Sequence, residues 1–158
     1  MFSESACLLA AEYGRTNILE YALQNGCECS SLVSTTAAHY GRLDCLQIAH
    51  KYGVPWTAKA CLEANNLPVL KYLHENGCPW THEECTKAVD TNDLEMLQYA
   101  HENGSEWSEE TWYMAFMRDA VTCLEYLFKN GCPQDLQTSN MIWAKKCYEF
   151  MKKQTENK

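Results

Sequence analysis

The hydrophobic pattern of the chain returns at a nearly constant interval, which indicates internal repeats. Five segments place apolar residues at the same spacing, and in each a glycine stands four residues after the last apolar position. These segments are Ile18-Leu19-x-Tyr21-Ala22, Cys45-Leu46-x-Ile48-Ala49, Val69-Leu70-x-Tyr72-Leu73, Met96-Leu97-x-Tyr99-Ala100 and Cys123-Leu124-x-Tyr126-Leu127. The spacing puts the apolar side chains on one stripe of a helix, and glycine is typical of a helix C-terminus. The pattern therefore predicts five helices, which end near Gly26, Gly53, Gly77, Gly104 and Gly131.

Another helical segment is predicted before each of these five helices and at the start of a sixth unit. It opens with a polar residue suited to cap a helix N-terminus, namely Ser3, Ser30 or Ser31, Thr57, Thr81, Ser108 and Asp135. Thr81 and Glu84 also have the spacing of a capping box. The first helices are expected to end near residues that tolerate a tight turn, namely Gly14, Gly41, Asn92 and Asp119. Each repeat is thus expected to be a helix, a short turn, a second helix and a loop.

These units predict an all-α fold, an α-solenoid of about five or six stacked helix-turn-helix repeats in one domain. A single helix pair cannot bury its apolar face alone, whereas stacked pairs can. The third repeat is three residues short at its interhelix turn, and Pro68 suits the first turn of its second helix. The last unit is either a sixth helix pair or one long terminal helix. The expected repeats are 3–29, 30–56, 57–80, 81–107 and 108–134, followed by a capping unit at 135–153.

The stretches Ala10-Ala11-Glu12-Tyr13-Gly14 and Ala37-Ala38-His39-Tyr40-Gly41, each followed by an apolar stripe, carry a family resemblance. They resemble the middle of an ankyrin repeat, and five in-phase copies make the resemblance specific. Two features depart from that family: the period is 27 residues instead of 33, and the Thr-Pro-Leu-His opening is absent. The six missing residues fall where ankyrin repeats carry a β-hairpin finger, so we expect this finger to be absent. Another helix-pair solenoid is the alternative fold.

The phrase Asn76-Gly77-Cys78-Pro79-Trp80, which recurs in variants, is similar to that of short ankyrin repeats in large DNA viruses and some protists. Viral proteins of this type often join the array to a C-terminal box that recruits degradation machinery. Only about 24 residues follow the fifth repeat, so we expect no such box. The resemblance implies a protein–protein interaction scaffold, whose partner would be a host protein if the origin is viral.

Composition narrows the classes of partner. The chain of 158 residues is 46% hydrophobic, enough for a sizeable core, and its 13 basic and 21 acidic residues give a net charge of −8. Nucleic acids and anionic membranes attract basic surfaces, so neither is expected to bind this acidic chain. The expected partner is a basic protein.

No apolar stretch approaches the roughly 20 residues that span a bilayer, and the start lacks the basic segment of a signal peptide. We expect a monomer in the cytoplasm or nucleus, of the host cell if viral, and not a secreted protein.

Ten cysteines follow the repeat register. Where one repeat has cysteine, others have small or apolar residues at the equivalent position, which is the behaviour of packing residues. Equivalent thiols in stacked repeats lie roughly 10 Å apart, too far for a disulfide. We therefore expect reduced, mostly buried thiols. Three sets of equivalent positions hold nine of them: Cys7, Cys61 and Cys85; Cys45, Cys123 and Cys147; and Cys27, Cys78 and Cys132.

A metal site is the alternative for some of these thiols. Cys27-x-Cys29 is a close pair, and His74-x3-Cys78 could bring two ligands together at a helix end. No second pair completes a tetrahedral set, so we expect no metal and no cofactor.

Two further sets of equivalent positions, one of histidines and one of tryptophans, each have two interpretations. The recurring histidines could form a ladder of ligands, but contacts with the last carbonyls of each helix are the simpler interpretation. The recurring tryptophans could form an exposed binding ladder, but packing against the next repeat is favoured. The histidines are His50, His74 and His101, and the tryptophans are Trp56, Trp80 and Trp107.

No enzyme is expected, because the thiols and histidines are distributed by repeat register and not gathered at one activated site. The expected function is a noncatalytic protein-binding scaffold, and a structural or self-assembling repeat protein is the alternative; a thiol- or zinc-binding protein ranks below both.

The binding surface is expected at the ends of the first helices. In ankyrin repeats these residues face a concave groove, and in this chain they differ between repeats in residue type and charge. The candidate residues are Glu12, Tyr13, His39, Tyr40, Asp90, Thr91, Met117 and Arg118.

Overall fold

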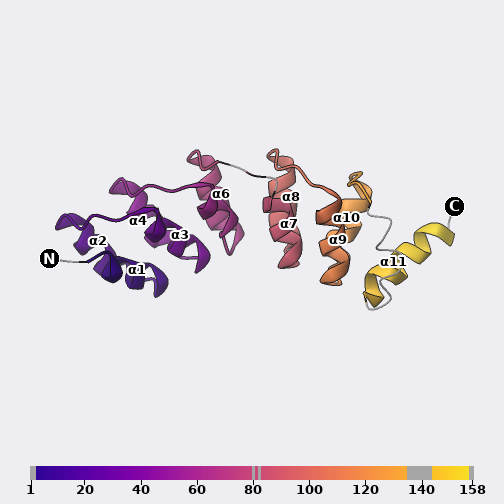
Figure 1. The fold of residues 1–158 in the computed structure, drawn as a ribbon, viewed down its shortest axis with the longest axis horizontal. Coiled ribbons are helices and arrows are strands. Elements are labelled where there is room, and N and C mark those ends of the chain that lie inside the picture. The colour runs from indigo at the N-terminus through magenta and orange to yellow at the C-terminus, as the bar shows by residue number, and fades with distance from the viewer. Residues whose placement is uncertain (1–2, 80, 82, 135–143, 157–158) are drawn as a thin grey trace. The chain divides into compact units, whose positions relative to one another are not determined.

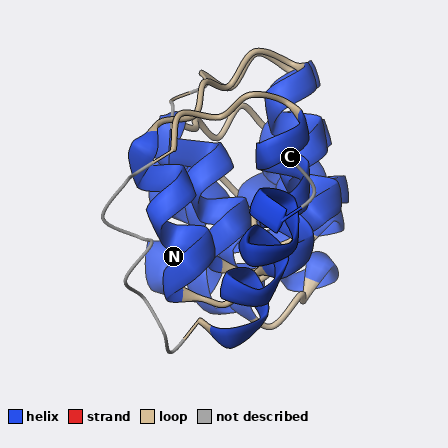
Figure 2. Ribbon diagram, turned by 90° about the vertical axis from the view of Figure 1, so that its right-hand side faces the viewer, coloured by secondary structure: helices blue, strands red, loops and turns tan. Residues whose placement is uncertain are grey.

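A computed structural model describes residues 3–79, 81, 83–134 and 144–156 of the chain. Within these residues the secondary structure is helical, with no strand (Figures 1 and 2). Asp135 and Trp80, for which the sequence predicts a cap and a recurring tryptophan, lie outside the described residues. The helices are α1 (Glu4–Glu12), α2 (Thr16–Gln24), α3 (Ser31–His39), α4 (Leu43–Lys51), α5 (Ala58–Leu62), α6 (Leu67–Glu75), α7 (Glu83–Asp90), α8 (Leu94–Glu102), α9 (Glu109–Met117), α10 (Val121–Lys129) and α11 (Lys145–Glu156).

The chain divides into two compact units, Met1–Trp80 and Thr81–Lys158, at the boundary predicted between the third and fourth repeats. In the first unit, α1, α3 and α5 contact one another in sequence order, as do α2, α4 and α6. In the second unit, α7 contacts α9, α8 contacts α10, and α10 contacts α11. The predicted all-α solenoid of helix pairs that pack in sequence order is confirmed.

Residues of both helices of each pair form the core of each unit, and in the second unit Trp112 and Phe116 of α9 are the large buried residues of a first helix. Ala10, Ala11, Ala37 and Ala38 are buried in the first unit, so neighbouring helices approach closely there. The predicted stripe of the second helices is also buried, as at Leu19, Leu46, Leu70, Leu97 and Leu124. Burial of this repeated stripe stabilises each pair against its neighbours, as expected for a stacked array.

Both helices of a repeat end as the sequence predicts. Asn92 (φ 53°) and Asp119 (φ 49°) take the left-handed conformation that glycine takes in the equivalent turns of the first two repeats. The residue after this turn donates its backbone N–H to a carbonyl near the helix end, for example Arg15 to Ala10 at 2.7 Å. This bond satisfies a carbonyl that would otherwise lack a partner inside the helix.

The third repeat is shortened at its first helix. α5 has only five residues and ends at Leu62. The Asn66 side chain accepts a hydrogen bond from Val69 N–H and caps α6, while Pro68 lies in the first turn. The prediction for Pro68 is therefore confirmed.

The predicted N-caps differ in what their side chains do. Ser30 and Ser108 accept hydrogen bonds from the first turns of α3 and α9. Glu84 accepts the backbone N–H of Thr81 at 2.8 Å, as its predicted capping-box role requires. Ser3 and Thr57 hold the N-cap position without a side-chain bond to the helix.

Helix α11 takes the place of the second helix of a sixth repeat. Cys147 Sγ donates to the carbonyl of Ala115 at 3.5 Å, and Cys45 Sγ makes the equivalent bond to Ala10 at 3.8 Å. The Cys147 N–H also donates to the Asp119 carboxylate at 3.0 Å. The register predicted for Cys147 is therefore confirmed, whereas residues 135–143, where a partner helix would begin, lie outside the described residues.

Candidate functional sites

The eight residues proposed from the sequence lie where the first helices end. Tyr13, His39, Tyr40, Thr91, Met117 and Arg118 are exposed, whereas Glu12 and Asp90 are half-buried. Glu12 and His39 are the last residues of α1 and α3, and Asp90 and Met117 are the last residues of α7 and α9.

Several of these residues also join neighbouring repeats. His39 Nδ1 lies 2.9 Å from the Glu63 carboxylate, and Arg118 pairs with Asp90 at 2.6 Å. The nearby Glu12 carboxylate raises the pKa of the Tyr40 hydroxyl, because the charged phenolate would lie beside a negative group. The sequence did not reveal these pairs, since each joins residues from 24 to 28 positions apart.

Tyr13 and Tyr40 are the two tyrosines of this surface. Their exposed fractions are 60% and 42%, and the helices that they follow, α1 and α3, are in contact. A shallow depression of about 310 Å³ adjoins them, lined by Tyr13, Gly14, Arg42 and other residues of the first two repeats. The structure therefore brings an aromatic ridge and a depression together at one place in the first unit.

A recurring aromatic cluster joins the loop of one repeat to the second helix of the next. His50 Nδ1 lies 2.8 Å from the Tyr72 hydroxyl, and its ring packs on Trp56 with 4.2 Å between centroids. In the fourth and fifth repeats, His101 stacks on Trp107 at 3.6 Å and bonds to the Tyr126 hydroxyl at 3.1 Å.

These clusters change two expectations. The Nδ1 atoms of His50 and His101 bond to a tyrosine of the next repeat and not to the last carbonyls of their own helices. Trp56 and Trp107 are half-buried, so they are neither a fully buried core nor a fully exposed ladder. Burial lowers the pKa of His101 because the charged imidazolium is disfavoured there.

All ten cysteines lie within the described residues, and none of them is in a disulfide. Eight are buried, as expected, while Cys27 and Cys29 are half-buried. The thiols of Cys78 and Cys132 donate to the carbonyls of Thr57 and Ser108, the first residues of the same repeats. These two thiols therefore help to hold the loop that follows the second helix of each repeat.

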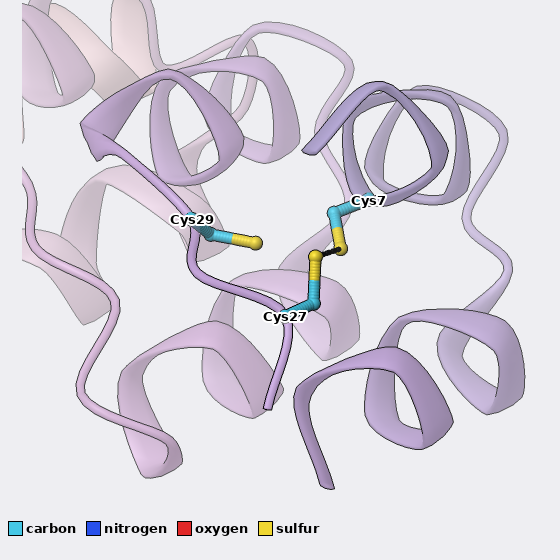
Figure 3. Close-up of side chains that lie close together, drawn as sticks. All are labelled: Cys7, Cys27 and Cys29. Atoms are coloured by element: carbon cyan, nitrogen blue, oxygen red, sulfur yellow. Dashed lines mark hydrogen bonds between the residues drawn. The ribbon is translucent and has the colours of Figure 1, made fainter. Parts of the chain in front are cut away.

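The two half-buried thiols meet a third one (Figure 3). Cys7 of α1 points towards the loop that holds Cys27 and Cys29, and its Sγ lies 3.4 Å from that of Cys27. The three sulfur atoms lie within 4.8 Å of one another, and among the described residues no other group of three metal-ligating side chains is this close. Burial raises the pKa of both Cys7 and Cys29, so these thiols hold their protons at neutral pH.

The sequence indicated Cys27 and Cys29 as a close pair but did not place Cys7 beside them. The repeat register predicts only that Cys7 is a packing residue, because its approach to the loop depends on how that loop returns to α1. One signal was present: Cys29 occupies the position at which the next three repeats carry Trp56, Trp80 and Trp107. The alternative pair, His74 and Cys78, does not belong to the cluster.

Comparison with known proteins adds no family. No protein-family model matches the chain, and no curated protein matches it. None of the described helices combines the length and apolar character needed to cross a membrane.

Proposed function

We propose that the chain is a noncatalytic scaffold of short ankyrin-like repeats that binds a protein partner through the ends of its first helices. The observation that carries the proposal is the exposed pair Tyr13 and Tyr40 beside the depression between the first two repeats. Exposed tyrosines supply large, rigid contact area and are frequent at binding hot spots.

Charge favours a basic partner. Residues 81–134, the fourth and fifth repeats, contain 11 acidic and three basic residues. Such a concentration of one charge attracts an oppositely charged protein and speeds its association at low salt. The resemblance to short viral repeats makes a basic host protein of the cytoplasm or nucleus the proposed partner class.

A capture experiment tests this function. The full chain is immobilised and exposed to a host-cell lysate, and the bound proteins are identified. We expect a basic protein that is retained at low salt, released at high salt, and lost with the double variant Tyr13→Ala/Tyr40→Ala. Both substituted side chains are exposed, so the helix content and the melting temperature should change little.

Tyr148→Ala is the matched control, because Tyr148 is as exposed as Tyr40 (42%) but lies on α11. This variant should capture the same partner as the unmodified chain. Equal capture by the unmodified chain and the double variant would refute the assignment of Tyr13 and Tyr40 to the binding surface.

A self-assembling repeat protein is the second candidate, and one observation favours it. Ile18 is 52% exposed, although the equivalent residues of the later repeats, such as Cys45 and Val69, are buried against the preceding repeat. An apolar helix face of this kind could be covered by a second copy of the chain.

A further inference from the structure

We propose that the sulfur atoms of Cys7, Cys27 and Cys29 bind a thiophilic metal ion of the zinc class as three thiolates. The proposal does not depend on the protein-binding function, because none of the three cysteines belongs to the proposed binding surface.

The distances suit such an ion. Zinc binds thiolate at about 2.3 Å, so two sulfurs of a tetrahedral site lie roughly 3.8 Å apart. The Sγ atoms of Cys7 and Cys27 are 3.4 Å apart, and all three sulfurs lie within 4.8 Å of one another. Small side-chain rotations would therefore bring them into a metal-binding arrangement. The fourth position of the tetrahedron would be open to water or to an added ligand.

The cluster is specific to the first repeat and is not a consequence of the repeat register. The third repeat also has cysteines at the first two positions, Cys61 and Cys78, but both are buried and the third position there is Trp80. The counterparts of Cys27 in the later repeats, including Ser105 and Cys132, are buried, whereas Cys27 is half-buried. Only in the first repeat does the loop present two accessible thiols to a third.

The loop that holds Cys29 is fixed against the helix that holds Cys7. The Glu4 carboxylate, in the first turn of α1, accepts the backbone N–H of Ser30 at 2.7 Å and also its hydroxyl. Ser30 directly follows Cys29, and Cys7 lies three residues after Glu4 on the same helix. Both ligand-bearing segments are thus held together before any ion binds, which lowers the entropic cost of forming the site.

Metal binding exchanges protons for the ion. Each of the three thiols releases its proton to solvent as its sulfur becomes a thiolate ligand, so no oxidant or reductant is required. A disulfide between Cys7 and Cys27 is the competing use of the same atoms. It would leave Cys29 without a role, whereas a metal ion uses all three sulfurs.

The experiment uses the full chain, reduced and free of metal. Cd²⁺ is titrated in and followed by its thiolate charge-transfer absorption, and Zn²⁺ is then added as a competitor. We expect one ion per chain, displaced by Zn²⁺. Each of Cys7→Ser, Cys27→Ser and Cys29→Ser should weaken binding more than about tenfold, since even loss of an outer-shell partner costs 10–100-fold.

Other repeats carry serine at positions equivalent to two of these cysteines, and the third repeat supplies a control variant. Ser34 and Ser105 stand at the positions equivalent to Cys7 and Cys27 and are buried, so other repeats of this chain carry serine at both positions. Cys78→Ser, the same substitution at the equivalent of Cys27 in the third repeat, should bind Cd²⁺ as the unmodified chain does.

A second measurement on the unmodified chain decides the matter if a variant does not fold. Zn²⁺ should slow the labelling of Cys27 and Cys29 by a thiol reagent, followed residue by residue by mass spectrometry. The proposal is overturned if the reduced chain shows no saturable binding, or if Cys78→Ser weakens binding as much as Cys29→Ser. It is also overturned if mild oxidation joins Cys7 to Cys27 while the reduced chain takes up no metal.

Discussion

At Gly41 the backbone of the second repeat passes against the side chain of Asn66. Gly41 has a φ of +66°, and a Cβ atom at this position would clash with Asn66 Nδ2. Asn66 cannot easily move away, because its Oδ1 caps α6 through Val69 N–H at 3.0 Å and its Nδ2 donates to the Gly41 carbonyl. The absence of a side chain at Gly41 thus permits two things: the contact between the second and third repeats, and the position of Asn66 that caps α6.

Gly41→Ala should lower the free energy of unfolding by roughly 2–3 kcal/mol. The left-handed conformation costs a residue with a Cβ about 1–2 kcal/mol, and displacement of the Asn66 cap adds about 1 kcal/mol. Gly53→Ala is the matched control, since Gly53 has a φ of +75° but no heavy atom within 4 Å of the added Cβ. It should cost only the conformational part, about 1–2 kcal/mol. Equal losses in urea denaturation of the two variants would contradict the role of Asn66.

The Glu84 carboxyl group makes the free energy of unfolding depend on pH. Its Oε2 accepts bonds from Thr81, while Oε1 is buried without a hydrogen-bond partner among the described residues. Burial raises the pKa of Glu84 above the ordinary 4.5, although its bonds from Thr81 act in the opposite direction. The folded state therefore holds this proton more tightly than the unfolded state does.

The stability that Glu84 contributes should be complete below pH 4.5 and be lost as pH rises through its raised folded-state pKa. Glu84→Gln keeps an oxygen to accept the Thr81 N–H but does not titrate. The free energy of unfolding of the unmodified chain, relative to this variant, should thus fall between pH 4.5 and neutral pH. Glu83→Gln, at an exposed neighbouring position, serves as the control. A difference that does not change with pH would refute this role of the carboxylate.

At the scale of the helices, the sequence best predicted the features that depend on residues close together along the chain, such as helix ends and turns. The positive φ of Asn92 and Asp119, and Pro68 in the first turn of α6, follow from local residue preferences. The partners that side chains find in other segments did not follow. Cys7 of α1 meets Cys27 of a loop 20 residues away, and His101 of α8 meets Tyr126 of α10, which is 25 residues away. Periodicity specifies which face of a helix is buried, but it does not specify which loop atom meets that face.

The cluster of His101, Trp107 and Tyr126 couples the fourth repeat to the fifth. Tyr126→Phe removes one hydrogen bond and should lower the free energy of unfolding by about 1 kcal/mol. Trp107→Ala removes a half-buried indole that stacks on His101 and should cost about 2 kcal/mol, less than a fully buried tryptophan. The exposed Tyr148→Phe should change little. If chemical denaturation gives Tyr126→Phe and Tyr148→Phe equal stability, the hydrogen bond to His101 does not stabilise the fold.

At the scale of the whole molecule, the stability of each unit is a sum over its repeats and the contacts between adjacent repeats within that unit. In the first unit, Lys51 pairs with Glu20 at 2.9 Å and Gln24 donates to the Tyr52 hydroxyl at 3.0 Å, each across one repeat boundary. Such exposed contacts contribute little singly. The repeated burial of residues on both helices of each pair therefore supplies most of the coupling. An apolar residue that lacks this burial shows where the array can accept a further neighbour.

Ile18 is that residue, and it decides between a monomeric scaffold and a self-assembling protein. We expect light scattering to give a mass of 18.1 kDa that does not depend on concentration, because a few exposed apolar residues are normal on a monomer. A mass that rises with concentration would instead favour assembly through the exposed face of α2. In that case Ile18→Lys should restore the monomer, since a charged group would have to be buried in the contact. Leu32→Lys is the control, because Leu32 is equally exposed and its counterparts Lys59 and Glu110 are already charged. Assembly that survives Ile18→Lys, or that Leu32→Lys abolishes equally, would rule out stacking of copies through the α2 face.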